Sequence, residues 1–288
     1  MQPVFQPTAV SFSILLAAFG CPHVAAAASD DPASWVWNDP KDLGIPGLKH
    51  ATIESESMGR TVGYQIYLPP QYESEDGRRF PVVYFLHGAG GTESSDAGLA
   101  RRVHAEIAGG RIAPVIYVFP NGGQRSGYRD SATNYVQAES LLIQELIPHV
   151  DRVYRTMEDP AARGICGFSM GGGGAIRLSL KYPDTFGAAA ALAAALDRGP
   201  DSHAGDNCYT HASALTEAQR DRLRLYLVIG DEDFLYARQE PFLKHLHELG
   251  IPYTSVVHSR VGHNLGVLSQ LSANAMIRHM ARELTDRP

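Results

Sequence analysis

The sequence contains few cysteines. Its 288 residues include only Cys21, Cys166 and Cys208, which excludes a small scaffold built on disulfide bonds. Cys166 ends an apolar run, where a free cysteine packs as a small hydrophobic side chain. We therefore expect Cys166 and Cys208 to be unpaired. The alternative is a disulfide between these two in a chain that has lost Cys21.

The sequence also lacks an excess of basic residues. Its formal net charge is −6, its pI is about 6.0, and only 19% of its residues are charged. Nucleic acid is therefore not an expected partner, because phosphate binding needs clustered Lys and Arg. The hydrophobic content of 44% is that of a globular protein, and the length suits one large α/β domain or two smaller ones. Nothing in the sequence indicates an oligomeric state.

No apolar run near the N-terminus is long enough for a comfortable transmembrane helix. The run from Ala9 to Gly20 is followed by the alanines Ala25–Ala28, which offer A-x-A cleavage sites. We therefore predict a signal peptide over residues 1–28 and a secreted or periplasmic protein, although residues 1–8 contain no Lys or Arg. Two alternatives are lipoprotein processing at Cys21, where bulky Phe19 is unusual, and an uncleaved tail.

Hydrophobic patterning predicts a mostly parallel sheet with helices on both faces. After a lead segment (29–50), two alternating stretches around residues 58–60 predict an antiparallel hairpin. Strands and helices then alternate along the remaining chain, as in other α/β folds. The expected strands are 81–88, 113–120, 163–169, 187–196, 221–230 and 252–259. The expected helices are 94–110, 134–154, 170–182, 237–250 and 266–286.

One polar segment, residues 197–220, interrupts this alternation and shows no strand pattern. It lies between two strands, so we expect an insert within the 51–288 domain, over the carboxyl ends of the strands, where ligands of open α/β sheets bind. The segment contains several residue types that ligate metals, namely Asp201, His203, Asp206, Cys208 and His211. Such loops are usually just solvated, and we expect no metal here.

The glycine-rich stretch at residues 164–174 lacks what a phosphate-binding loop requires. No lysine follows the glycines until Lys181, and the spacing does not match a dinucleotide-binding fingerprint. Gly167-Phe168-Ser169-Met170-Gly171 instead matches G-x-S-x-G between a strand and a helix. In that turn, side chains two residues before and after the serine would clash. We predict that Ser169 is a nucleophile; the alternative is a helix N-cap serine.

A serine nucleophile needs a base and an acid, which follow it in this order: serine, acid, histidine. The loop after the strand at 221–230 offers Asp231, Glu232 and Asp233. We favour Asp233 because it lies past the turn, with Asp231 second. The loop after the last strand offers His258, which ends the strand itself. It also offers His263, which we favour because its ring is free to swing toward the serine.

An oxyanion hole needs two backbone N–H groups directed at the charged oxygen. One is expected from Met170, the residue after the nucleophile. The other is expected from the glycine-rich loop 88–91, where we favour Ala89. His87 and Gly88 lie at the start of this loop, and we expect both among the substrate-binding residues. We expect His87 to brace the loop by hydrogen bonding, with action as a base the alternative.

Several segments resemble, in order, the bacterial putative-esterase family: "PVVYFLHGAGGTE", "YRDSATNY", "GFSMGG" with "YPDTF", "IGDEDF" and "VGHNLGV". That family includes feruloyl and acetyl xylan esterases of carbohydrate esterase family 1, esterase D-type S-formylglutathione hydrolases and mycolyltransferases. The resemblance implies an α/β-hydrolase fold and the triad of Ser169, Asp233 and His263. We expect no cofactor. It also implies that the segment 128–131 lines the active site, with Tyr128 and Asp130 on the substrate side. For Asp130 the alternative is a turn residue.

These observations predict a secreted serine carboxylesterase that acts on a small-molecule or carbohydrate ester, such as a feruloyl or acetyl ester. Two alternatives use the same residues. One is an acyltransferase that passes the acyl group to an alcohol, and the other is an inactive hydrolase fold that serves as a binding module. Stable membrane insertion is not expected.

Overall fold

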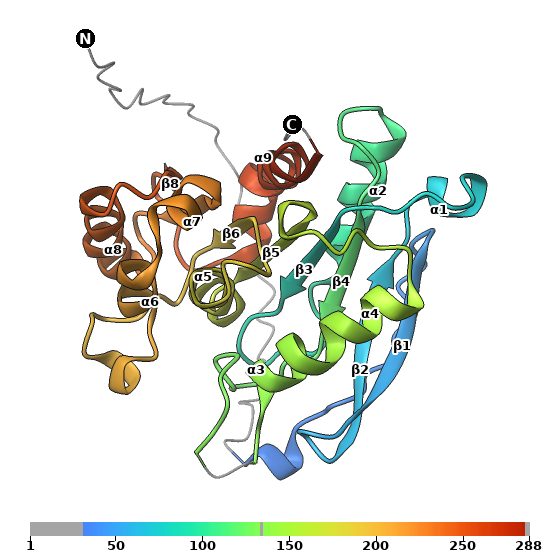
Figure 1. The fold of residues 1–288 in the computed structure, drawn as a ribbon, viewed down its shortest axis with the longest axis horizontal. Helices are drawn as coiled ribbons and strands as arrows, with labels where there is room; N and C mark the ends of the chain where they lie inside the picture. Colours follow the sequence, from blue (N-terminus) through green and yellow to red (C-terminus); the bar gives the residue numbers. More distant parts are fainter. Residues whose placement is uncertain (1–30, 133–134, 286–288) are drawn as a thin grey trace.

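The computed structural model describes residues 31–132 and 135–285. It contains one eight-stranded sheet with the order β1-β2-β4-β3-β5-β6-β7-β8 (Figure 1). The strands are β1 (Leu48–Ser55), β2 (Arg60–Tyr67), β3 (Val82–Leu86), β4 (Ile116–Pro120), β5 (Arg163–Phe168), β6 (Ala188–Leu192), β7 (Arg224–Gly230) and β8 (Tyr253–His258). The predicted signal peptide, residues 1–28, and Cys21 lie outside the described residues.

The N-terminal hairpin and the direction of the other strands are as predicted. β1 and β2 pair antiparallel, and β2 pairs antiparallel with β4. The six remaining strands run parallel to one another. β1 begins at Leu48, so the hairpin takes in the last residues of the lead segment. Because the central strands are parallel, their carboxyl ends lie at one edge of the sheet.

Buried side chains alternate between the two faces of the sheet, which accounts for the continuous apolar runs of the central strands. In β3, Val82, Tyr84 and Leu86 enter one core, whereas Val83 and Phe85 enter the other. α2 and α9 cover the second face, and α4, α5, α6 and α8 cover the first. The helices are α1 (Gln71–Ser74), α2 (Ala100–Ala108), α3 (Ala138–Ser140), α4 (Ile147–Val153), α5 (Met170–Lys181), α6 (Cys208–Ala214), α7 (Glu217–Arg222), α8 (Tyr236–Glu248) and α9 (Leu265–Thr285).

The helix expected over residues 134–154 begins later and is not uniform. Its first turn is α3, which continues through a π-helical segment (Leu141–Leu146) into α4. Tyr135–Gln137 stay outside the helix, because Gln137 pairs with Asp130 in an isolated antiparallel bridge. Pro148 has no N–H to donate to the preceding turn, which favours the wider π-helical geometry before it.

The polar segment 197–220 has no strand, as predicted, but it is not an unstructured insert. It forms a short 3₁₀ turn (Ser202–Gly205) and then α6 and α7, which connect β6 to β7. Cys208, Tyr209 and Ala212 pack into the core against α5 and α8. The spacing of these three residues is that of one face of a helix. It could have predicted α6, but the polar composition of the segment hid the pattern.

Two smaller predictions concern cysteines and membranes. Cys166 and Cys208 are both buried and free, so the prediction that they do not pair is confirmed. Within residues 31–132 and 135–285, none of the helices has the length and apolar character needed to cross a bilayer.

Candidate active site

Ser169 lies in a strained turn between β5 and α5. Its φ of 52° and ψ of −114° are unusual for a residue with a side chain. A Cβ on Gly167 would lie 2.5 Å from the carbonyl carbon of Gly171, and one on Gly171 would lie 2.0 Å from Leu86 O. The two motif glycines are therefore required sterically, as the motif predicted. The turn leaves Ser169 half-buried at the carboxyl edge of the sheet.

The extra glycines of the stretch allow α5 to approach its neighbours closely. A Cβ on Gly173 would lie 2.3 Å from Ala195 O, and one on Gly174 would lie 3.0 Å from the Tyr128 side chain. α5 therefore packs closely against the segment that leaves β6 and against Tyr128. In addition, Ala195 N–H donates to Ser169 O at 2.8 Å, which fixes the turn from the same side.

The loops that follow β7 and β8 are joined by their backbones. Asp231 N–H donates to His258 O at 3.0 Å, and Glu232 N–H donates to Val261 O at 3.1 Å. A Cβ on Gly230 would lie 1.8 Å from Val261 O, so the loops meet without an intervening side chain. This junction brings the residues after each strand end together, although they are far apart in sequence.

Asp233, His263 and Ser169 form one hydrogen-bonded chain. The Asp233 carboxylate lies 2.8 Å from Nδ1 of His263, and Nε2 of His263 lies 2.8 Å from Ser169 Oγ. Asp233 is 4% exposed, and its other oxygen accepts the Leu235 N–H. A carboxylate only accepts hydrogen bonds, so Nδ1 carries the proton and Nε2 is left to accept from the serine hydroxyl.

The competing candidates lie elsewhere. Asp231 is exposed and accepts the Arg260 N–H, and Glu232 is exposed. His258 hydrogen-bonds Ser272 Oγ at 2.6 Å. The structure therefore brings together Asp233 and His263, the acid and the histidine that were favoured from their positions in the two loops.

Two phenylalanines hold the ring of His263, and sequence reasoning did not find them. The Phe168 ring stacks on it with centroids 5.0 Å apart, and the Phe234 ring lies 4.6 Å away at a tilt. Phe234 is nevertheless 73% exposed. The position of Phe234 directly after Asp233 could have predicted this contact, because a residue beside the acid lies within reach of the base. The rings restrict where the imidazole can move.

The N–H groups of Ala89 and Met170 are available to bind an anion. Within residues 31–132 and 135–285, neither group has a hydrogen-bond partner. Met170 opens α5, so its N–H lies at the positive end of the helix dipole. Ala89 is exposed, in the loop after β3.

His87 fixes the peptide that carries the Ala89 N–H. Its Nε2 accepts the Gly122 N–H at 3.2 Å, so Nδ1 carries the proton and donates to Gly88 O at 2.8 Å. In a trans peptide the N–H points away from the carbonyl, so holding Gly88 O orients the Ala89 N–H. Burial lowers the pKa of His87 to about 4, although its hydrogen bond to Gly88 opposes this shift. His87 is thus a neutral brace, as expected. At 2% exposed it is too buried to contact a substrate, which corrects its expected place among the substrate-binding residues.

Tyr128 and Asp130 have partners inside the protein. Tyr128 is 1% exposed, and its hydroxyl donates to His87 O at 3.3 Å. The Asp130 carboxylate accepts the N–H groups of Glu139 and Ser140 at the start of the helix and the Ser140 hydroxyl. These contacts correct the substrate-side expectation: Tyr128 is too buried to meet a ligand, and Asp130 behaves as the turn residue that was its alternative. Gly88 remains at the site, with Phe168 3.0 Å from where its Cβ would lie.

The polar cluster of the 197–220 segment is an ion-pair network. Asp206 pairs with Arg129, Arg177 and Lys181 and accepts a hydrogen bond from His211. Burial raises the pKa of Asp206, but the His211 hydrogen bond and the neighbouring cations outweigh it and hold the pKa below its ordinary value. In the described part of the chain no group of three or more His, Cys, Asp or Glu side chains could hold a metal.

The lead segment supports the loop after β3, which sequence reasoning missed. Buried Glu93 accepts the Asp39 N–H at 2.5 Å and the Asn121 amide at 2.6 Å. Thr92 Oγ1 donates to the Asp39 carboxylate at 2.6 Å. The segment 36–39 is therefore fastened to the same loop that presents Ala89. No local pattern could have shown this, because the partners are more than fifty residues apart.

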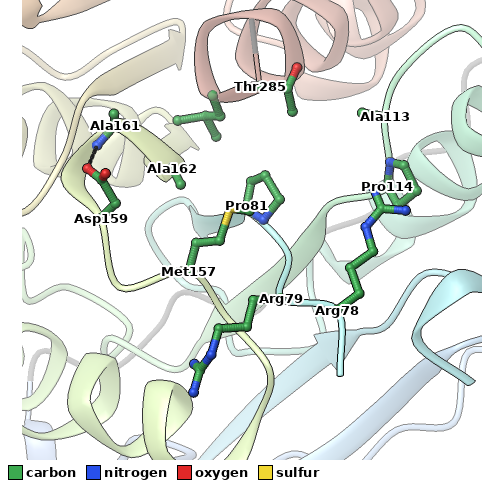
Figure 2. Close-up of a pocket in the computed structure, with 11 residues that line it drawn as sticks. Arg78, Arg79, Pro81, Ala113, Pro114, Met157, Asp159, Ala161, Ala162 and Thr285 are labelled. Carbon is green, nitrogen blue, oxygen red and sulfur yellow. Dashed lines mark hydrogen bonds between the residues drawn. The ribbon is translucent and has the colours of Figure 1, made fainter. Parts of the chain in front are cut away.

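A cavity lies at the opposite edge of the sheet from Ser169 (Figure 2). Its volume is about 520 Å³, and its lining includes Arg78, Arg79 and Met157. Pro81 and Ala162 also line it, and they directly precede β3 and β5. The cavity is therefore at the amino ends of the strands, away from Ser169.

The model of the putative esterase family matches residues 55–246 of the chain. An esterase of Mycobacterium tuberculosis is 26% identical over 251 residues, which cover 73% of this chain and 54% of the relative. An endo-1,4-beta-xylanase/feruloyl esterase of Xylanibacter ruminicola is 34% identical over 157 residues, which cover 51% of this chain and 21% of the relative. The chain thus spans about half the length of the first relative and about a fifth of the second.

Solved structures show the same fold. A ferulic acid esterase superimposes with a TM-score of 0.73 at 24% sequence identity, and the match covers 82% of this chain and 98% of the other. The mostly parallel sheet, the strained serine after β5 and the family match over more than half of the chain agree. This chain belongs to the putative esterase family and has the α/β-hydrolase fold.

Proposed function

We propose that this chain is a serine carboxylesterase that works through an acyl-enzyme on Ser169. The observation that carries the proposal is the continuous hydrogen-bonded chain from Asp233 through His263 to Ser169 Oγ, with both distances 2.8 Å. Family membership supports it, because the family's members include esterases.

In the proposed mechanism, His263 Nε2 takes the Ser169 proton as Oγ attacks the ester carbonyl. Asp233 stabilises the imidazolium, and the N–H groups of Ala89 and Met170 bind the oxyanion. The imidazolium then protonates the departing alcohol, leaving the acyl group on Ser169. Water, deprotonated by His263, attacks the acyl-enzyme, and the acid leaves as the proton returns to Ser169.

The proposed substrates are esters of carbohydrates that carry a feruloyl or an acetyl group. The names of two similar proteins support an aromatic acyl group: one is a ferulic acid esterase and one includes a feruloyl esterase. We propose that residues 51–288 form one catalytic domain, preceded by the lead segment 29–50. We propose that residues 1–28 direct its export, which the apolar run and the alanines support.

A labelling experiment tests the proposal. A fluorophosphonate probe is expected to label the wild-type protein, and Ser169→Ala is expected to abolish the labelling. The wild type should hydrolyse at least one of methyl ferulate, acetylated xylan, S-formylglutathione and short p-nitrophenyl esters. Product analysis with added sugar alcohols separates hydrolysis from acyl transfer. Ester turnover that survives Ser169→Ala unchanged would overturn the proposal.

Export is tested separately. The full chain, expressed in a bacterium with an intact secretion pathway, is expected outside the cytoplasm. Its N-terminus, read by mass spectrometry, should lie near Ala28. A chain retained in the cytoplasm with Met1 intact would contradict this part of the proposal.

A further inference from the structure

The turn after β4 (121–124) contacts the loop after β3 at two points. Gly122 N–H donates to Nε2 of His87 at 3.2 Å, and the last carbonyl of the turn accepts the Gly90 N–H at 2.7 Å. His87 precedes Ala89 in the loop and Gly90 follows it, so the turn holds the backbone on both sides of the Ala89 N–H. A displacement of the turn would therefore displace the N–H group that is proposed to bind the oxyanion.

The centre of this turn has no room for side chains. A Cβ on Gly122 would lie 2.1 Å from the Tyr128 ring, and one on Gly123 would lie 2.6 Å from the Trp37 ring. The φ of Gly123 is 83°, in the region that favours glycine. The position of the turn therefore depends on its backbone contacts and on the side chain of its first residue, Asn121.

Asn121 fastens the turn to two other segments. The residue is fully buried, and its Oδ1 accepts the Gly123 N–H at 3.1 Å. Its Nδ2 donates to Val36 O at 2.9 Å and to Oε2 of Glu93 at 2.6 Å. An amide nitrogen of this kind has two hydrogens, so both are in use. The side chain thus links the turn to the lead segment and to the loop after β3.

Glu93 requires this amide as a donor. It is 1% exposed, and a Cβ on Gly63 would lie 2.0 Å from its Oε1, so β2 encloses the carboxylate. Oε1 accepts the Asp39 N–H at 2.5 Å and lies 3.2 Å from Nε2 of His50, whereas Oε2 accepts from Asn121. A buried acceptor that loses its donor is costly, so Glu93 in turn fixes the orientation of the Asn121 amide.

We propose that Asn121 is a positioning residue of the oxyanion hole, which holds the Ala89 N–H in place through the turn at 121–124. The inference rests on the proposed function. Asn121 does not touch the substrate in this proposal; it acts through the backbone of the turn and through His87 on the oxyanion loop (88–91). A misplacement of about 1 Å far from the chemistry can cost about 10²-fold in rate, so this support bears directly on catalysis.

Asn121→Ala removes the amide and leaves the triad in place. It is expected to lower kcat for p-nitrophenyl acetate by about tenfold to 100-fold, because a misplaced donor stabilises the oxyanion less. KM should stay within about twofold of wild type, since the oxyanion exists only in the transition state and the tetrahedral intermediate. Steady-state kinetics of protein whose circular dichroism matches the wild type provide the measurement.

An alkyl trifluoromethyl ketone tests the oxyanion hole without turnover. Ser169 Oγ bonds to its carbonyl carbon, the serine proton passes to His263, and the carbonyl oxygen becomes an oxyanion that no leaving group can relieve. Such an adduct resembles the transition state. Its inhibition constant should therefore rise in Asn121→Ala by about the factor by which kcat/KM falls.

Asn207→Ala is the matched control. Asn207 is also fully buried, and its Nδ2 donates to Pro200 O and to Ser202 O at 2.8 Å each. Its Oδ1 accepts the Thr210 N–H at 2.9 Å, so it caps α6 rather than supporting the loop after β3. The control removes an equivalent set of hydrogen bonds, and it should keep the wild-type kcat and inhibition constant.

Exchanging the donor and the acceptor is a second test, which keeps the volume of both side chains and also applies if Asn121→Ala does not fold. Asn121→Asp alone places two carboxylates together, and Glu93→Gln alone directs one amide nitrogen at another, so each should lower kcat. In the double variant the new amide can donate to the new carboxylate, while the Gly123 and Asp39 N–H groups keep their acceptors. Its kcat should return to within about fivefold of wild type.

The outcomes separate this inference from the proposed function. If Asn121→Ala and Asn207→Ala lower kcat equally, or if the double variant is no faster than the slower single variant, Asn121 has only a structural role. The inference is then overturned and the proposed function stands. An unchanged kcat and inhibition constant in Asn121→Ala also overturns it. If a fluorophosphonate does not label the wild type at Ser169 and the wild type hydrolyses no ester, both fail.

Discussion

The two edges of the parallel strands both carry cavities, but they differ in what surrounds them. The amino-edge cavity is the larger, at about 520 Å³ against about 290 Å³ for a carboxyl-edge cavity lined by Phe85, Leu192 and Leu265. Figure 2 shows Arg78, Pro81 and Met157 around it. The carboxyl edge instead carries the strained serine, the buried acid and the histidine. Cavity size therefore does not locate the chemistry in this protein.

The difference follows from strand direction. In a parallel sheet with crossover helices, the carboxyl edge receives the turns that start helices, with their free N–H groups. Met170 provides such a group at the start of α5. Residues at the amino edge are those that enter the strands, such as Pro81 and Ala162. The following predictions test whether the two edges differ in function as they do in structure.

Removal of the nucleophile should have the largest effect. Ser169→Ala is expected to lower kcat/KM by roughly 10⁶-fold, as loss of a serine nucleophile does in other triads. The measurement is hydrolysis of p-nitrophenyl acetate by protein whose circular dichroism matches the wild type. Residual activity within tenfold of wild type would contradict the proposal that the reaction takes place at Ser169, on the carboxyl edge of the sheet.

Removal of the acid's charge should have the next largest effect. Asp233→Asn is expected to lower kcat by about 10⁴-fold, because the amide no longer selects the required His263 tautomer. Glu232→Gln is the control, since Glu232 is exposed beside it, and it should keep wild-type kcat. Equal losses in the two variants would contradict the choice of acid.

Acid should destabilise the carboxyl edge through His87. Burial lowers its pKa to about 4, and an unfolded histidine titrates near 6.5. As pH falls through this window the unfolded state binds the proton first, so stability is lost, by up to about 3 kcal/mol at pH 4. His87→Asn should show a correspondingly shallower decline in urea unfolding between pH 6.5 and 4. Identical slopes would show that His87 does not titrate as its burial requires.

The exposed aromatic beside the base should have a smaller effect. Phe234→Ala removes one ring contact to His263, and such contacts contribute about 0.5–1.5 kcal/mol. We expect kcat to fall by about twofold to tenfold for p-coumarate and cinnamate esters alike. A change in the ratio of the two esters would instead place Phe234 in substrate selection.

Substitutions at the amino edge should have no effect on catalysis. Arg79→Ala and Met157→Ala change the lining of the larger cavity, and each is expected to leave kcat/KM within about twofold of wild type. Ester kinetics at saturating and subsaturating substrate provide the measurement. A loss of tenfold or more with unchanged folding would make the amino edge part of the active enzyme.

Much of the fold could be predicted from the sequence, because strand and helix patterns depend on residues that are close together in the chain. Continuous apolar runs predicted the buried strands, and alternation predicted the hairpin of β1 and β2. The helix at 138–153 was predicted too long because a backbone bridge between Asp130 and Gln137 holds the residues before it outside the helix. The resemblance to the esterase family implied that Asp130 lies near the substrate, whereas its carboxylate caps the helix.

The sequence by itself determined the serine turn, since a Cβ on Gly167 would meet Gly171 within the same five residues. The tertiary structure adds the second requirement, because a Cβ on Gly171 would meet Leu86 O of β3. The sequence also determined that the acid and then the base follow the serine along the chain, because each lies in the loop after a later strand. Only the tertiary structure decided that Asp233 rather than Asp231 meets His263, and that Asp39 supports the oxyanion loop. These contacts join residues far apart in sequence. They depend on how separate loops converge at one edge of the sheet, which no local spacing encodes.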